Sequence, residues 1–292
     1  YVTEPVCDVV LERVKGNRQV FLDYALSLVE AHDARLQTDT IANRGFALAN
    51  PSLRKSHAKA RKVKLEPSIS VGEAFEAIVQ SSITHLLANQ TAALGGDPNG
   101  VHQTRVAMRR LRAALRAFKK VLPYEGRKAC NGELRWFQQR TGPARDWFVF
   151  ADETLPRLTA RHVSAEEMAK LAKVAAQNGR MQAREAAKLL QGRRHTRMLL
   201  RFGKWISALF EKGRCPHFAD PVLPFACKAL AKTHRDLLSE LELARPDAME
   251  DMHNVRIRGK KARYACEFFA ALFEGEGAKT YLHTVETLQD RL

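Results

Sequence analysis

The chain has 292 residues, 45% of them apolar, with a net charge of +16 and an isoelectric point near 9.9. This composition suits one or two globular domains with a core. No apolar run approaches the ~18 residues of a membrane span. The charge points to an anionic partner: nucleic acid, polyphosphate or an anionic membrane surface.

The first 49 residues predict one strand and one helix. Val6–Val14 alternates weakly between apolar and polar residues, which indicates a strand, and Arg18–His32 has the apolar spacing of a helix. One strand and one helix cannot form a sheet domain by themselves. We therefore expect residues 1–49 to be the C-terminal remnant of a larger domain.

Residues 50–69 predict a basic linker. Asn50–Pro67 carries six Lys or Arg residues and one acid, with a proline at each end of the stretch. Low apolar content and proline are typical of a linker. A solvated linker and a polyanion-binding arm both remain open.

From Ser70 onward the apolar residues recur at helical spacing, which predicts an all-α fold. Gly- and Pro-rich turn signals separate the expected helices at 70–94, 100–121, 125–141, 144–157, 164–190, 193–212, 221–243, 249–273 and 276–292. Long helices with short connections predict packed antiparallel bundles. The turn at Gly213–Pro224 divides a first helical half, residues 70–212, from a second half, residues 213–292.

One basic element occurs twice. Val101–Phe118, "VHQTRVAMRRLRAALRAF", holds five arginines and no acid, and it aligns without a gap on Met252–Phe269, "MHNVRIRGKKARYACEFF", at a constant offset of 151. Solvated helix faces normally mix charges of both signs. The acid-free repeat therefore predicts two similar half-domains that each bind an anion.

Helical geometry places most of these cations on one face. At ~100° per residue, one stripe holds His102, Arg105, Arg109, Arg112 and Arg116. The adjacent apolar stripe, which we expect to face the core, holds Met108, Leu111, Leu115 and Phe118. The second copy places His253, Arg256, Lys260 and Arg263 on the equivalent face, with Glu267 in place of Arg116. Such a ladder spans about 21 Å, which suits an extended polyanion better than one small phosphate.

Other cations are weaker candidates for binding the anion. Arg110 and Lys261 lie about 100° from the stripes. Helical spacing also groups Arg197, Arg201 and Lys204, and then Lys228, Lys232 and Arg235. For these two groups a solvated face and a binding face remain equally open.

The paired H-x-x-R-x-x-x-[RK]-[RK]-x-R elements resemble the CHAD domain family, the conserved-histidine α-helical domains. "TGPARDWFVF", Thr141–Phe150, and "RRHTRMLLRFGKWI", Arg193–Ile206, resemble two further helices of that family. The resemblance covers about residues 70–292 and implies two helical bundles related by a pseudo-twofold axis, with the basic helices lining a central channel. It implies binding of inorganic polyphosphate without catalysis. The counterpart of "GPARD" would begin after Leu292, so we expect a truncated second half.

The N-terminal residues resemble a different family. "VVLERVKGN" and the following "FLDYALSLVEAHDARLQTDTIANRGFALA" resemble the closing strand and helix of a CYTH domain, the triphosphate-tunnel fold. The E-x-E-x-K signature of that family is missing. Triphosphatase activity is therefore not carried over to this chain.

Our hypothesis is a polyphosphate-binding module without catalytic residues, metal ligands or cofactors. The expected polyphosphate-binding residues are His102, Arg105, Arg109, Arg110, Arg112, Arg116, His253, Arg256, Lys260, Lys261, Arg263, Arg197, Arg201, Lys228, Lys232 and Arg235. The alternatives are a helical nucleic-acid-binding protein and an accessory module of a CYTH triphosphatase. The stripes hold no aromatic residue for stacking bases, which disfavours a single-strand binder.

We also expect a location. Five cysteines lie far apart without a C-x-x-C motif, which fits reduced thiols. No signal peptide opens the sequence. We expect a cytoplasmic protein without membrane association, with polyphosphate granules as a further expected location.

Overall fold

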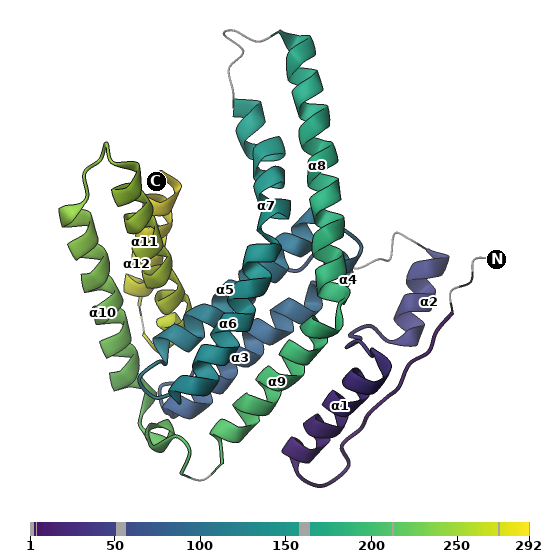
Figure 1. Cartoon of the computed structure of the whole chain (residues 1–292). Coiled ribbons are helices and arrows are strands. Elements are labelled where there is room, and N and C mark those ends of the chain that lie inside the picture. Colours follow the sequence, from purple (N-terminus) through teal and green to yellow (C-terminus); the bar gives the residue numbers. More distant parts are fainter. Residues whose placement is uncertain are drawn as a thin grey trace. The chain divides into compact units, whose positions relative to one another are not determined.

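The computed structural model describes residues 3, 5–50, 57–157, 164–211, 213–273 and 275–291, and the regular structure in these ranges is helical (Figure 1). The all-α prediction is confirmed. The chain forms two compact units. The first comprises Tyr1–Ala60, Ile83–Arg109 and Lys128–Leu209, and the second comprises Arg61–Ser82, Arg110–Arg127 and Phe210–Leu292. Helices α3 (Val71–Ala88), α5 (Pro98–Ala117) and α6 (Tyr124–Arg140) each contribute residues to both units.

The remaining helices of the first unit are α1 (Arg18–His32), α2 (Ile41–Ala49), α4 (Gln90–Leu94), α7 (Gly142–Val149), α8 (Ala165–Gln191) and α9 (Arg193–Leu209). Helix α7 continues into a π-helical turn at Phe150–Thr154 and a 3₁₀ turn at Leu155–Arg157. It packs along α8, and Figure 1 shows the two side by side. Ser164 and Glu167 form a capping box that begins α8, because each side chain satisfies a backbone N–H that the helix leaves unpaired.

The N-terminal strand prediction is not confirmed. Val6–Val14 has no regular secondary structure, and Val9, Val10 and Val14 are exposed. A strand needs a partner for its backbone groups, and the described residues offer none here. The helix at Arg18–His32 is confirmed, and α2 follows it, where we expected no element.

Helix α1 packs against α9. Ala25 and Val29 are buried in this contact, and three acids of α1 or its C-terminal cap reach cations of α9. These ion pairs are Arg197–Glu30 at 2.7 Å, Arg193–Asp33 at 3.0 Å and the pair of Lys204 with Asp23. We call this set the α1–α9 ion pairs.

The predicted linker at residues 50–69 contains buried positions. Residues 51–56 lie outside the described part of the chain. Beyond them, Val63 and Leu65 are 6% and 4% exposed, so both side chains contribute to the core of the second unit. The Asn89 amide donates to the Ala58 carbonyl at 2.9 Å, which holds the segment to the end of α3. The described part of the segment is therefore anchored by two buried apolar side chains, whereas its cations Lys59, Arg61, Lys62 and Lys64 are exposed.

The second unit contains α10 (Val222–Leu243), α11 (Met249–Phe269) and α12 (Gly277–Arg291), with α11 in contact with both neighbours. A 3₁₀ turn at Pro216–Ala219 precedes α10, and another at Ala270–Leu272 follows α11. One residue from α10, two from α11 and one from α12 form a buried cluster: Leu237, Val255, Ala262 and Val285. Val255 and Ala262 of the second basic helix are therefore part of the core of this unit.

Helix boundaries repeat at the offset found in the sequence. Val71 begins α3 and Val222 begins α10, and these positions differ by 151. Pro98 begins α5 and Met249 begins α11, again 151 apart. The sequence repeat is therefore also a repeat of secondary structure.

A local two-fold relation exists within the second unit. Val71 N–H donates to the Asp220 carbonyl at 2.8 Å, and Val222 N–H donates to the Ile69 carbonyl at 3.1 Å. At the offset of 151, Val222 is the counterpart of Val71 and Ile69 is the counterpart of Asp220, so the two hydrogen bonds are equivalent. Phe118 also contacts its own counterpart, Phe269, with ring centroids 5.9 Å apart. Such reciprocal contacts are the signature of a two-fold axis.

The predicted helices from Ser70 onward agree well with those in the structure, with one interruption. The helix expected at 70–94 is divided at Asn89, whose side chain bonds the Ala58 segment and the His85 carbonyl. Leu292, the last residue of the final expected helix, lies outside the described residues.

Gly100 allows α4 and α5 to approach, because a Cβ atom there would lie 2.5 Å from the Ala93 nitrogen.

Candidate functional site

The basic stripe of α5 begins in the first unit with His102, Arg105 and Arg109. All three side chains are half-buried, and the neighbouring cation Arg145 comes from α7. Burial first, and then Arg145, Arg109 and Arg105, lower the pKa of His102 to about 4, against a smaller opposing effect of Glu153. His102 is therefore a neutral imidazole near neutral pH, with arginines around it. We call His102, Arg105, Arg109 and Arg145 the first cluster.

Arg105 also has a structural contact. Its Nη1 donates to the Thr141 hydroxyl at 3.1 Å and to the Gln138 carbonyl, at the C-terminal end of α6. These carbonyl and hydroxyl groups belong to a helix terminus, where a cation is favoured. Burial and the nearby Arg109 lower the pKa of Arg105, whereas Asp146 opposes this. Arg105 therefore both positions α6 and adds charge to the first cluster.

Arg109 has a buried donor without a partner among the described residues. Its Nε atom is inaccessible to solvent and makes no hydrogen bond there. An unpaired buried donor costs about 1–3 kcal/mol, and more for a charged group. The first cluster thus combines excess positive charge, a neutral imidazole and a guanidinium with one unsatisfied buried donor.

A second group of cations lies in the second unit. Burial first, and then Arg258 and Arg116, lower the pKa of the Lys261 ammonium, while Asp236 and Glu240 oppose this. Arg258 donates to Glu240 at 2.9 Å, so part of its charge is balanced. Arg116 is exposed. We call Arg116, Arg258 and Lys261 the second cluster.

Two other residues predicted to bind polyphosphate, Arg110 and Arg263, lie in ion-pair contact with acidic side chains. Arg110, only 6% exposed, pairs with Glu267 at 2.8 Å, and its guanidinium lies over the Phe268 ring at 5.5 Å. Arg263 lies 3.6 Å from Glu267 and 3.8 Å from Glu286. Burial raises the pKa of Glu267, against the opposing effect of Arg263 and Arg110. Arg110 is therefore a buried part of the unit, whereas Arg263 is half-buried, and Glu267 balances part of the charge of both.

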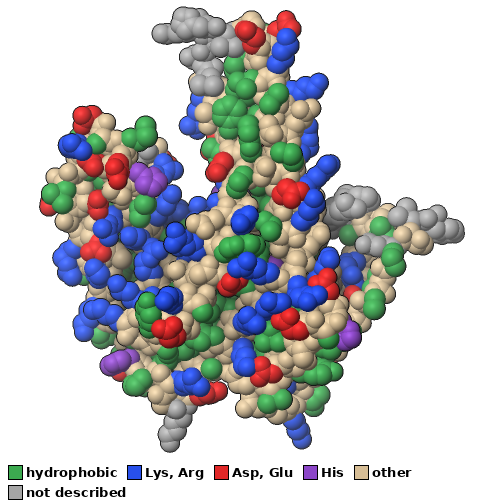
Figure 2. All heavy atoms as spheres, viewed as in Figure 1, with side chains coloured by type: hydrophobic (Ala, Val, Ile, Leu, Met, Phe, Trp, Pro, Cys, Tyr) green, Lys and Arg blue, Asp and Glu red, His purple; other side chains and the backbone are tan. Residues whose placement is uncertain are grey.

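The other predicted residues of the two stripes differ in exposure. Arg112 and Lys260 are half-buried, whereas His253 and Arg256 are exposed. On α10, Lys228 and Arg235 are exposed, and Lys232 pairs with Asp236 at 3.0 Å. Figure 2 shows Lys and Arg side chains gathered over α10 and α11.

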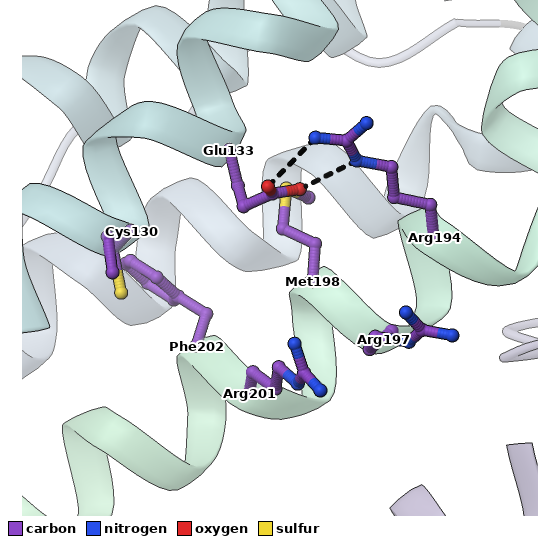
Figure 3. A pocket seen from close by; sticks show the side chains of 8 residues that line it. Cys130, Glu133, Arg194, Arg197, Met198, Arg201 and Phe202 are labelled. Atoms are coloured by element: carbon purple, nitrogen blue, oxygen red, sulfur yellow. Dashed lines mark hydrogen bonds and ion pairs between the residues drawn. The ribbon is translucent and has the colours of Figure 1, made fainter. Parts of the chain in front are cut away.

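The remaining predicted residues, Arg197 and Arg201, line a pocket of about 540 Å³ between α6 and α9. Figure 3 shows Glu133 and Arg194 pointing toward each other there, joined by hydrogen bonds of 2.9 and 3.0 Å. Arg197 pairs with Glu30, as described above, and Arg201 is exposed. Two of the three arginines are thus already balanced by acids of the chain.

Sequence reasoning missed Arg145 and Arg258. Arg145 lies in the "GPARD" string, which carried the family resemblance, but a single arginine beyond the basic helix gave no periodicity to follow. It also pairs with Glu153 at 2.8 Å. Arg258 lies within the second basic helix but off its predicted face. Its side chain takes part because Lys261, also off that face, lies beside it.

Within the described ranges, no group of three His, Cys, Asp or Glu side chains is placed to hold a metal ion. Among the helices of those ranges, none has the length and apolar character needed to cross a bilayer. All five cysteines are unpaired.

The fold and the site define a class of protein: an all-helical domain built from a duplicated bundle, with basic residues on the repeated helix of each copy. The sequence model of the CHAD domain matches residues 77–292, so the chain belongs to the CHAD domain family. The crystal structure of the CHAD domain from the plant Ricinus communis is similar, with a TM-score of 0.71 and 29% sequence identity. The match covers 80% of this chain and 78% of that chain. A comparison with curated proteins finds no match.

Proposed function

We propose that this protein binds inorganic polyphosphate through the cations of α5 and α11, without turnover. The single observation that carries this proposal is the first cluster, where Arg105, Arg109 and Arg145 surround a neutral His102. Membership in the CHAD domain family supports it, since the resemblance implies a polyphosphate ligand.

The chemistry of the side chains suits phosphate. A guanidinium presents forked donors that match two phosphate oxygens, and the neutral imidazole can donate one further hydrogen bond. A polyphosphate chain repeats such oxygens along its length, so it can use several cations of one helix face. Binding releases counterions from the chain, which gives a favourable and salt-dependent contribution.

The test is competition binding at fixed ionic strength. Labelled polyphosphate bound to the protein is displaced by unlabelled polyphosphate, single-stranded DNA, duplex DNA or RNA at equal phosphate concentration. The proposal requires polyphosphate to displace the label at least ~10-fold better than any nucleic acid, a difference of ~1.4 kcal/mol. Equal displacement by all four competitors would instead indicate a general polyanion binder and contradict the proposal.

We further propose that residues 1–49 are the end of a CYTH-like domain. The segment leaves several apolar side chains exposed: Val9, Val10, Val14, Val20, Tyr24 and Phe46. The rest of such a domain would cover them and pair with Val6–Val14 as a strand. Expression of the chain with its natural upstream sequence, followed by hydrogen exchange, tests this: protection of Val6–Val14 is expected, and unchanged exchange would contradict it.

A further inference from the structure

The local two-fold relation of the second unit links two pairs of side chains that differ in charge. Arg110 of α5 pairs with Glu267 of α11 at 2.8 Å. At the offset of 151, Arg110 corresponds to Lys261, and Glu267 corresponds to Arg116. The counterpart of an ion pair is therefore a pair of cations, Lys261 and Arg116.

The contacts near the axis support this correspondence in space as well as in sequence. Phe118 follows Arg116 by two residues and touches Phe269, its own counterpart, at 5.9 Å between ring centroids. The reciprocal hydrogen bonds of Val71 and Val222 lie in the same unit. A relation that carries Phe118 onto Phe269 also carries Arg110 and Glu267 toward the positions of Lys261 and Arg116.

The side chains around the two pairs follow the same pattern. Glu267 is shared between Arg110 and Arg263, so one carboxylate balances two guanidinium groups. The counterpart of Arg263 is Arg112, another cation. Around Lys261 the nearby charges include Arg258 and Arg116, and the acids Asp236 and Glu240 are engaged by Lys232 and Arg258. On one side of the two-fold axis Glu267 thus supplies a carboxylate to Arg110, and on the other side Arg116 occupies the equivalent position.

The two pairs also differ in access. Arg110 is 6% exposed and Glu267 is 21% exposed, so their contact is largely closed to a ligand. Arg116 is exposed and Lys261 is half-buried. A ligand oxygen can therefore reach the cationic pair from solvent, whereas the internal ion pair is covered.

We propose that a phosphoryl group of the ligand binds between Arg116 and Lys261, where it supplies the negative charge that Glu267 supplies to Arg110 on the other side of the two-fold axis. Glu267 thereby acts as a built-in anion that closes one of two equivalent phosphate positions. The inference rests on the proposed function and makes the site asymmetric: the Lys261 end takes phosphate, and the Arg110 end is already neutralised.

The Arg116→Glu variant tests this directly, because it restores a carboxylate at the equivalent position. Without ligand, the new carboxylate should pair with Lys261 and raise Tm by about 2 °C, since like charges are replaced by an ion pair. Tripolyphosphate and long polyphosphate should then bind about 10- to 100-fold more weakly, because one phosphate position is filled. Lys173→Glu, at an exposed position of α8, makes the same change in net charge. It should weaken binding less than ~3-fold.

A second variant separates the pairing from general effects of charge on α5. Lys261→Gln removes a repulsion in the wild type and an attraction in the Arg116→Glu background. Its effect on Tm should therefore change sign, from a small rise to a fall, in a double-mutant cycle. An equal change in Tm in both backgrounds would show that positions 116 and 261 do not interact, and would overturn the proposal.

The outcomes also distinguish this inference from the proposed function. If the wild type binds polyphosphate and Arg116→Glu binds it equally well, the phosphate position is wrong and the proposed function stands. If the wild type does not bind polyphosphate in calorimetry at low salt, both proposals are overturned. If binding falls and the cycle changes sign, both are supported.

Discussion

Replacement of His102 by Gln should remove most of the pH dependence of polyphosphate binding between about pH 5 and pH 7.5. His102 has a pKa of about 4 without ligand, because burial and then three arginines disfavour its charged form. A bound phosphate neutralises those arginines and accepts a hydrogen bond from the imidazole, so it must raise this pKa. Binding then takes up a proton and becomes tighter as the pH falls.

The size of this effect follows from the two pKa values. If ligand returned the pKa of His102 from about 4 to its ordinary 6.5, binding at about pH 5 would be favoured about 30-fold, with almost no gain at about pH 7.5. The imidazole is only half-buried, so solvent screening reduces the gain, and we expect about 5- to 10-fold. His253→Gln, at the exposed counterpart of His102 in α11, is the matched control replacement.

The assay is calorimetry of tripolyphosphate binding to wild type, His102→Gln and His253→Gln across this pH range, in two buffers of different ionisation enthalpy. The buffer dependence reports proton uptake by the complex, and titration of the ligand itself cancels between variants. Proton uptake in the wild type that disappears in His102→Gln is expected. Identical pH profiles of all three proteins would refute the assignment of His102 to the phosphate site.

Three further results are expected. Polyphosphate affinity should fall steeply with salt, with a negative log–log slope of several units; a slope near zero in a salt titration would contradict electrostatic capture. Arg109→Ala should cost about 1.5–3 kcal/mol of binding, and Lys173→Ala much less, as measured by calorimetry; equal losses would mean that only net charge matters. Arg105→Ala should lower Tm as well as affinity in thermal unfolding, because Arg105 also holds the end of α6. Arg109→Ala should not lower Tm, because it removes a buried donor that has no partner among the described residues.

Periodicity made the helices from Ser70 onward predictable, because the buried face of an amphipathic helix carries an apolar residue every three to four positions. The same principle placed Leu111 and Phe118 in the core, and both are buried. The strand at Val6–Val14 is not confirmed, because alternation shows only that a segment could pair. It does not show that a partner is present.

The candidate site was only partly predictable, since helical spacing reports neighbours on one helix and not those from another. It indicated that His102 and Arg109 share a face. It could not reveal Arg145, which approaches from α7, or Glu267 holding Arg110, because both contacts join residues far apart in the sequence. The sequence alignment showed that Glu267 replaces Arg116 in the second copy. Which cation Glu267 pairs with depends on the two-fold relation, which only the structure shows.

The α1–α9 ion pairs have a consequence for experiments on fragments. A fragment that begins at residue 77, where the family match begins, lacks α1 and leaves Arg193, Arg197 and Lys204 without Asp33, Glu30 and Asp23. Each of these cations, without its acidic partner, is then available to bind an anionic polymer. Measurements on the isolated domain would then overstate the affinity for polyanions and the size of the binding site. In the longer chain, the acids of α1 compete with a polyanion for the cations of α9.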